Sequence, residues 1–269
     1  MTTKWKQIRT MIKLETNISY PTPVLELIVS LPFIFVSYGV LQFIIGISVP
    51  SYFVPSFLFW DKLTSTIITL GTKEYAEAIF SMCSIMLFIV PIMVTFNLAR
   101  ELENEITKTI LSYPIKRWIY FLTKIFMIIV PIIIAINVGI GISVSVFVPF
   151  GFKIENALLM SLAFCVLIFA VAASTSLIAV FTRNLLATAV LGCGIWYGLY
   201  FLAILSDYDV VLRGVFNPAL MAVSFAGEQV FGFIRDVTMT DFLLSISFSF
   251  LLGCAMLIIA LIRFNRMEV

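Results

Sequence analysis

The sequence predicts an all-α polytopic membrane protein with six transmembrane helices. Of its 269 residues, 61% are hydrophobic and only 12% are charged, and the mean hydropathy is +1.11. A soluble domain carries about 25% charged residues, so most of this chain is expected to lie in lipid. Apolar stretches of span length recur along the chain, and Lys and Arg are concentrated in alternate connections between them.

Six stretches are long enough to cross a bilayer, whose core of about 30 Å needs about 20 apolar residues. The predicted spans are 24–48, 78–98, 118–148, 156–181, 185–206 and 241–263. Pro32, Pro91 and Pro131 fall inside the first three spans, where we expect kinks.

The amino-terminal residues 4–16 precede the first span. Trp5, Ile8 and Ile12 recur at helical spacing among Lys and Arg residues, which indicates a basic amphipathic helix on the inner leaflet. A solvated basic leader is the alternative interpretation.

The distribution of Lys and Arg predicts the orientation. Of the 17 basic residues, 12 lie in segments on the amino-terminal side of the membrane. Because cytoplasmic segments hold an excess of Lys and Arg, both termini are predicted to be cytoplasmic in a multi-pass protein of the cell (plasma) membrane.

The predicted external loop, 207–240, contains an uncharged run of thirteen residues, 215–227, which is too short to cross. We expect a re-entrant or interfacial segment there, before the last span. Asn217 and Pro218 lie in this run.

Several function classes are disfavoured by composition. The chain has no His, which removes His-ligated metals and Ser-His triads, and its four Cys all lie in apolar runs. It has no P-loop motif, and its Asp residues lie outside the spans or at their ends. We therefore expect no enzyme activity, bound cofactor, metal site or nucleic-acid partner for this chain alone.

Polar and small side chains inside the spans indicate helix packing. Gln42 and Asn137 are neutral and are expected to form hydrogen bonds between helices. Gly194 and Gly198 form a small-x-x-x-small pair in the fifth span, and small residues cluster over 170–176 in the fourth. The pattern leaves open whether such faces pack within one subunit or between two.

The predicted cytoplasmic loop, 99–117, begins as a charged extension of the second span and ends at Pro114, which cannot continue a helix. Glu101 and Glu105 are one helical turn apart, so a cation from elsewhere, for example on a partner protein, would relieve their repulsion. A solvated acidic face is the alternative. Ile110, Leu111 and Tyr113 give the loop an apolar tip.

This loop resembles the coupling region of permeases of the ABC-2 (export-type) class of ATP-binding-cassette transporters. The family has an A-R-E-x-E stretch, an apolar helix ending in proline, and a basic-aromatic return into the third span with a lysine shortly after. The matching residues are Ala99, Arg100, Glu101, Glu103, Ile110, Leu111, Pro114, Lys116, Arg117, Trp118 and Lys124. Where the family usually has Gly-Thr after the acidic stretch, this chain has Glu105-Ile106 or, with a shift of one, Ile106-Thr107. Asn217-Pro218 also resembles the start of the family's external segment.

The resemblance implies the permease subunit of an ATP-driven exporter, with two separate ATPase subunits that hold ATP and Mg and with a second permease copy or a paralogue. Residues 107–114 would form the coupling helix. The residues implied in ATPase coupling are Arg100, Glu101, Glu103, Glu105, Thr107, Ile110, Leu111, Tyr113, Pro114, Lys116 and Arg117.

A passive channel or an assembly scaffold without an ATPase is the rival function. For a transporter, aromatic and polar side chains in the spans suggest an apolar or amphipathic cargo, although lipid-facing packing explains the aromatic residues equally well. Candidate residues for the pathway or a dimer interface are Phe35, Gln42, Asn137, Gly194, Tyr197 and Gly198.

Overall fold

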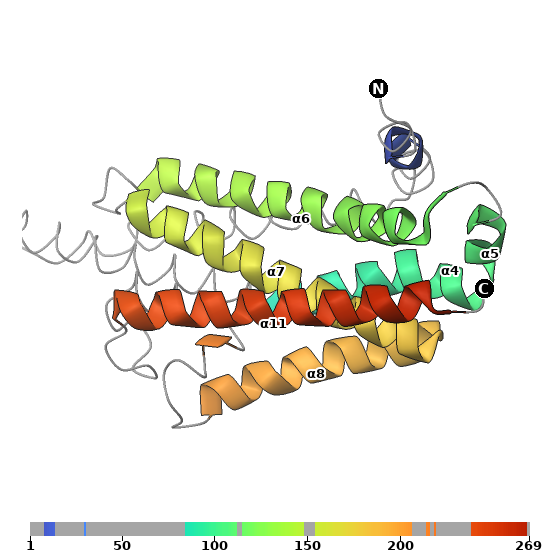
Figure 1. Ribbon diagram of the computed structural model, residues 1–269. Helices are drawn as coiled ribbons and strands as arrows, with labels where there is room; N and C mark the ends of the chain where they lie inside the picture. Colours follow the sequence, from blue (N-terminus) through green and yellow to red (C-terminus); the bar gives the residue numbers. More distant parts are fainter. Residues whose placement is uncertain are drawn as a thin grey trace, which may run out of the picture.

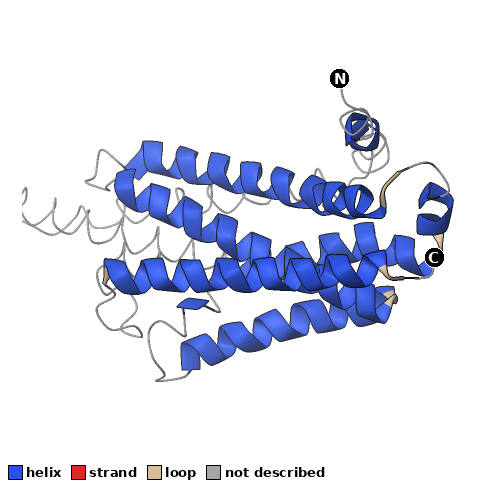
Figure 2. Cartoon of the chain, in the orientation of Figure 1, coloured by secondary structure: helices blue, strands red, loops and turns tan. Residues whose placement is uncertain are grey.

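A computed structural model describes residues 8–13, 30, 84–111, 115–147, 154–205, 214–215, 218 and 238–267. All regular structure within these ranges is helical (Figure 2). Apart from residue 30, the predicted first span, 24–48, lies outside the described residues, and so does most of the predicted external loop, 207–240.

The elements follow in the order η1 (Thr95–Ala99), α4 (Arg100–Glu103), α5 (Ile106–Leu111), α6 (Arg117–Phe147), α7 (Ile154–Thr182), α8 (Leu185–Leu205) and α11 (Met239–Asn265). η1 is one π-helical turn in a helix that the structure describes from residue 84 onward. The long helices lie side by side in one bundle, and α5 lies across one end of it (Figure 1).

Within the part of the chain that the structure describes, four helices are long and apolar enough to cross a membrane: Ser84–Glu103, Arg117–Ile142, Ala157–Thr182 and Met239–Asn265. They correspond to the second, third, fourth and sixth predicted spans. The fifth predicted span corresponds to α8, whose apolar part, Leu185–Phe201, is shorter than these four. The second span continues as helix through η1 and α4 to Glu103, five residues beyond its predicted end.

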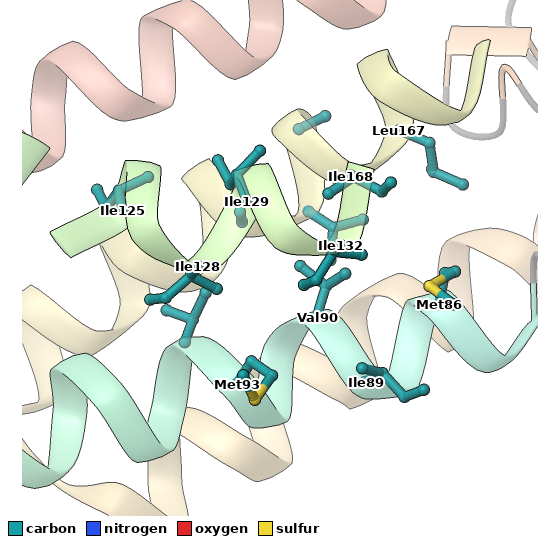
Figure 3. Close-up of a cluster of buried hydrophobic side chains, with 14 of the residues drawn as sticks. Met86, Ile89, Val90, Met93, Ile125, Ile128, Ile129, Ile132, Leu167 and Ile168 are labelled. Carbon is teal, nitrogen blue, oxygen red and sulfur yellow. The ribbon is translucent and has the colours of Figure 1, made fainter. Parts of the chain in front are cut away.

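The centre of the bundle is α7, which contacts η1, α6, α8 and α11. The small residues of α7 that the sequence predicts to form packing faces are all buried: Ala170, Ala172, Ala173, Ser174 and Ser176. Thr175, which lies between two of them, is buried as well. Figure 3 shows part of the apolar core, where Val90 and Met93 lie toward Ile132 and Ile128 of α6. Pro131 lies inside α6, which continues as one helix through that residue.

A close helix contact joins α11 to α7 at Gly253. A Cβ placed on Gly253 would lie 2.9 Å from two ring carbons of Phe169 and 3.2 Å from the Cα of Ala170. Ser245 and Ser249 are also buried on this side of α11. Helices in lipid are held together by such close packing, because apolar surface gains little by leaving lipid for protein.

The amino-terminal helix is described only over residues 8–13. Met11 is buried and belongs to the core cluster, whereas Arg9, Ile12 and Lys13 are exposed. Among the described residues 8–13, Met11 is therefore the buried contact between this helix and the bundle, and the predicted apolar face did not include it.

Replacing Gly253 with Val is expected to lower the free energy of unfolding by about 1–3 kcal/mol, because the added atoms collide with Phe169 and the α7 backbone. Thermal unfolding in detergent measures the loss. Gly141→Val is the matched control, since nothing lies within 4 Å of a Cβ at that position of α6. An equal effect of both variants would contradict the close contact.

Candidate functional site at the α5 end of the bundle

Five segments meet at one end of the bundle, which we call the α5 end: α4, α5, the start of α6, the connection between α7 and α8, and the end of α11 (Figure 1). The segments come from three distant parts of the sequence. The polar side chains that join them form the candidate functional site.

The chain turns sharply between α4 and α5. Asn104 donates its backbone N–H to the Arg100 carbonyl at 3.0 Å, and Glu105 has a φ of 56°, in the left-handed region. The Thr107 hydroxyl then donates to the Glu101 carbonyl at 3.3 Å. These contacts fix how α5 leaves α4.

Glu101 is the buried acid of the site. Its side chain forms an ion pair with Lys124 Nζ of α6 and accepts a hydrogen bond from the Tyr120 hydroxyl, also of α6. Glu101 is 8% exposed, Lys124 1% and Tyr120 0%. Both carboxylate oxygens therefore have a partner inside the bundle, as a buried acidic side chain requires.

A cation from elsewhere does balance Glu101 as expected, but it comes from this chain and not from a partner protein. The cation is Lys124, 23 residues further along the same chain. Glu101 and Glu105 do not share one helical face either, because the helix is interrupted at residues 104–105 and Glu105 is exposed.

Glu103 of α4 contacts the start of α8. Its carboxylate accepts the Leu185 backbone N–H at 3.1 Å and the Asn184 side-chain amide at 3.4 Å. Asn184 also caps α8, since its Oδ1 accepts the Ala187 N–H at 2.9 Å. An anionic group is favourable here because the first N–H groups of a helix lack partners within the helix and carry partial positive charge.

Arg117, the first residue of α6, contacts the end of α11. Its guanidinium donates to the backbone carbonyls of Met267 and Asn265. Cations are favourable at this end of a helix, where the last carbonyls are unpaired. The Phe264 ring stacks on Tyr120 and Phe121, with ring centroids 6.0 Å and 5.0 Å apart.

The other residues predicted for ATPase coupling lie around these contacts. Arg100, Glu105 and Lys116 are exposed, and Ile110 is half-buried. Leu111 ends α5, but its side chain, Tyr113 and Pro114 lie outside what the structure describes. Sequence reasoning missed Asn184; an Asn just before an apolar run is a helix-cap signal that could have identified it.

The candidate pathway residues do not join this site. Asn137 accepts a hydrogen bond from Ser161 of α7 and donates to the Ile133 carbonyl at 2.8 Å, so it bonds between helices as predicted. The Tyr197 hydroxyl donates to the Ser84 carbonyl at 2.9 Å.

Gly194 and Gly198 lie on the exposed side of α8, with nothing within 4 Å of a Cβ at either position. This pair therefore makes no close contact with the described part of its own chain. Phe35, Gln42 and Asn217 lie outside the described residues, and Pro218 is buried.

Within the described ranges, no three His, Cys, Asp or Glu side chains are grouped so that they could hold a metal ion. Comparisons with models of protein families, with curated proteins and with solved structures find no match. The geometry of the site is that of a junction: one carboxylate joins α4 to α6, and a second carboxylate and a guanidinium connect these two helices to the start of α8 and the end of α11.

Lys124→Met is expected to lower the free energy of unfolding by about 3–5 kcal/mol, because it leaves the Glu101 carboxylate buried without its cation. The double variant Glu101→Gln with Lys124→Met removes both charges and should regain most of that loss. Thermal or denaturant unfolding in detergent measures both. Lys116→Met, at an exposed position nearby, is the control. A double variant no more stable than Lys124→Met alone would contradict the ion pair.

Proposed function

We propose that this chain is the membrane-spanning permease subunit of an ATP-driven ABC transporter of the ABC-2 export class. The observation that carries the proposal is a short helix, α5, set across the end of an apolar bundle and connected to it through the buried Glu101–Lys124 ion pair. A cytoplasmic helix attached only by a loop could move without moving any span. A helix whose preceding turn is fixed to a span by a buried ion pair can transmit a displacement to that span.

The turn before α5 gives further support. Glu105 stands where the resembling family usually has glycine, and its φ of 56° is a conformation that glycine adopts without steric cost. A turn that glycine would make readily is thus made here by a residue for which it is less favourable.

In this proposal the ATPase binds to α5 and its surroundings. Ile106 at the start of α5 is 42% exposed and Trp118 at the start of α6 is 38% exposed, which provides apolar surface for a partner. Two ATPase subunits would hold ATP and Mg, and their closure would push α5. A second permease copy or a paralogue would complete the pathway.

The remaining details of the proposal come from the sequence. They are six spans, both termini in the cytoplasm, the plasma membrane as the location, an amino-terminal interfacial helix, an outer re-entrant segment, and export of an apolar or amphipathic cargo. Helices of span length and apolar composition support the membrane location in general terms.

The variant Leu111→Asp with Tyr113→Ala is expected to abolish assembly with the ATPase, since it places a charge at the apolar tip of the coupling loop. Co-purification of the ATPase from native membranes and its ATP hydrolysis are the two measurements. The matched control is Ile154→Asp with Glu155→Ala, at exposed positions of the first turn of α7, at the other end of the bundle. Assembly and hydrolysis equal to those of the wild type in the Leu111 and Tyr113 variant would contradict the proposal.

A further inference from the structure

The one-turn helix α4 carries two carboxylates with different partners. Glu101 and Glu103 are two residues apart, and at 3.6 residues per turn their side chains leave the helix about 200° apart. Glu101 binds Lys124 and Tyr120 of α6, whereas Glu103 binds Asn184 and the first N–H of α8. A displacement of α4 therefore acts on two helices that contact it from different sides.

The start of α8, which Glu103 contacts, is held together by its own hydrogen bonds. The Asn184 backbone carbonyl accepts a hydrogen bond from the Thr188 hydroxyl at 2.7 Å, and the Asn184 side chain accepts one from the Ala187 N–H. The Thr188 hydroxyl also lies 2.9 Å from that of Thr182, the last residue of α7. The corner between α7 and α8 is thus held by its own side chains, so a force on Asn184 or Leu185 acts on the whole first turn of α8.

Movement of α8 would affect its contacts with other helices inside the bundle. Gly192 lies so close to the helix that precedes η1 that a Cβ there would be 3.2 Å from the Cβ of Pro91. Further along α8, Trp196 donates its indole N–H to Ser174 at 2.7 Å and Tyr197 bonds the Ser84 carbonyl. A shift at the start of α8 must therefore be accommodated by α7 and by the second span.

We propose that Glu103 is a positioning residue that transmits the displacement of the coupling loop to α8, while Glu101 transmits it to α6. This division of roles rests on the proposed function for the source of the displacement. The contact between Glu103 and α8 does not depend on that function. Glu103 thus acts within the chain, rather than as part of the surface that the ATPase contacts.

The contact is tested by amide hydrogen exchange of the purified chain in lipid nanodiscs. The Leu185 N–H is in the first turn of α8, where the helix itself supplies no acceptor, so Glu103→Ala should speed its exchange about 5- to 10-fold. Glu103→Gln, which keeps an acceptor oxygen, should have a smaller effect. Glu155→Ala removes an exposed carboxylate from the first turn of α7 and should leave Leu185 unchanged. Unchanged exchange in Glu103→Ala would overturn the contact.

The transmission is tested on the complex that co-purifies with the chain, with and without ATP, Mg and vanadate. The wild type should show a nucleotide-dependent change in exchange in the first turns of both α6 and α8. Glu103→Ala should abolish the change in α8 and keep that in α6, whereas Glu155→Ala should keep both. A nucleotide effect on α8 that persists in Glu103→Ala, or is missing from the wild type while α6 responds, would overturn the inference and leave the proposed function intact. A preparation without an ATPase would overturn the proposed function, and the transmission with it.

Discussion

The buried ion pair between Glu101 and Lys124 is the constraint on which the α5 end of the bundle depends. A carboxylate this far from water is stable only with its cation and hydrogen-bond donors in place, so α4 and α6 must keep one relative position. That position sets the turn at residues 104–105 and the start of α5. It also places Tyr120 against Phe264, and thus α6 against the end of α11.

The interior of the bundle uses a different means of cohesion. In lipid, apolar side chains gain little by meeting one another, so specific contacts come from close packing and from hydrogen bonds between helices. Gly253 packs closely against Phe169. Asn137 with Ser161, and Trp196 with Ser174, form hydrogen bonds between helices. These contacts all include α7, which explains why this helix lies at the centre.

Helices, buried small residues and the interhelical bond of Asn137 could be predicted from the sequence, because each follows from local composition and spacing. The partner of Glu101 could not. Its identity depends on how the second and third spans pack, and a continuous helix through residue 105 would have placed Glu101 beside Glu105 instead. The left-handed conformation of Glu105 could not be predicted from the sequence, because a glycine is the residue that usually indicates such a turn and none is present there. The contact of Glu103 with α8 joins residues more than eighty positions apart, beyond the reach of any local pattern.

We propose that the α5 end couples this bundle to an ATPase, and a mild-detergent pull-down of the tagged chain from its native membranes tests this coupling. Partners are identified by mass, and ATP hydrolysis is assayed in the eluate. We expect a soluble subunit with a P-loop motif at about one copy per permease, together with ATP hydrolysis. Recovery of the chain alone, or with membrane proteins only, would show that no ATPase binds this end of the bundle.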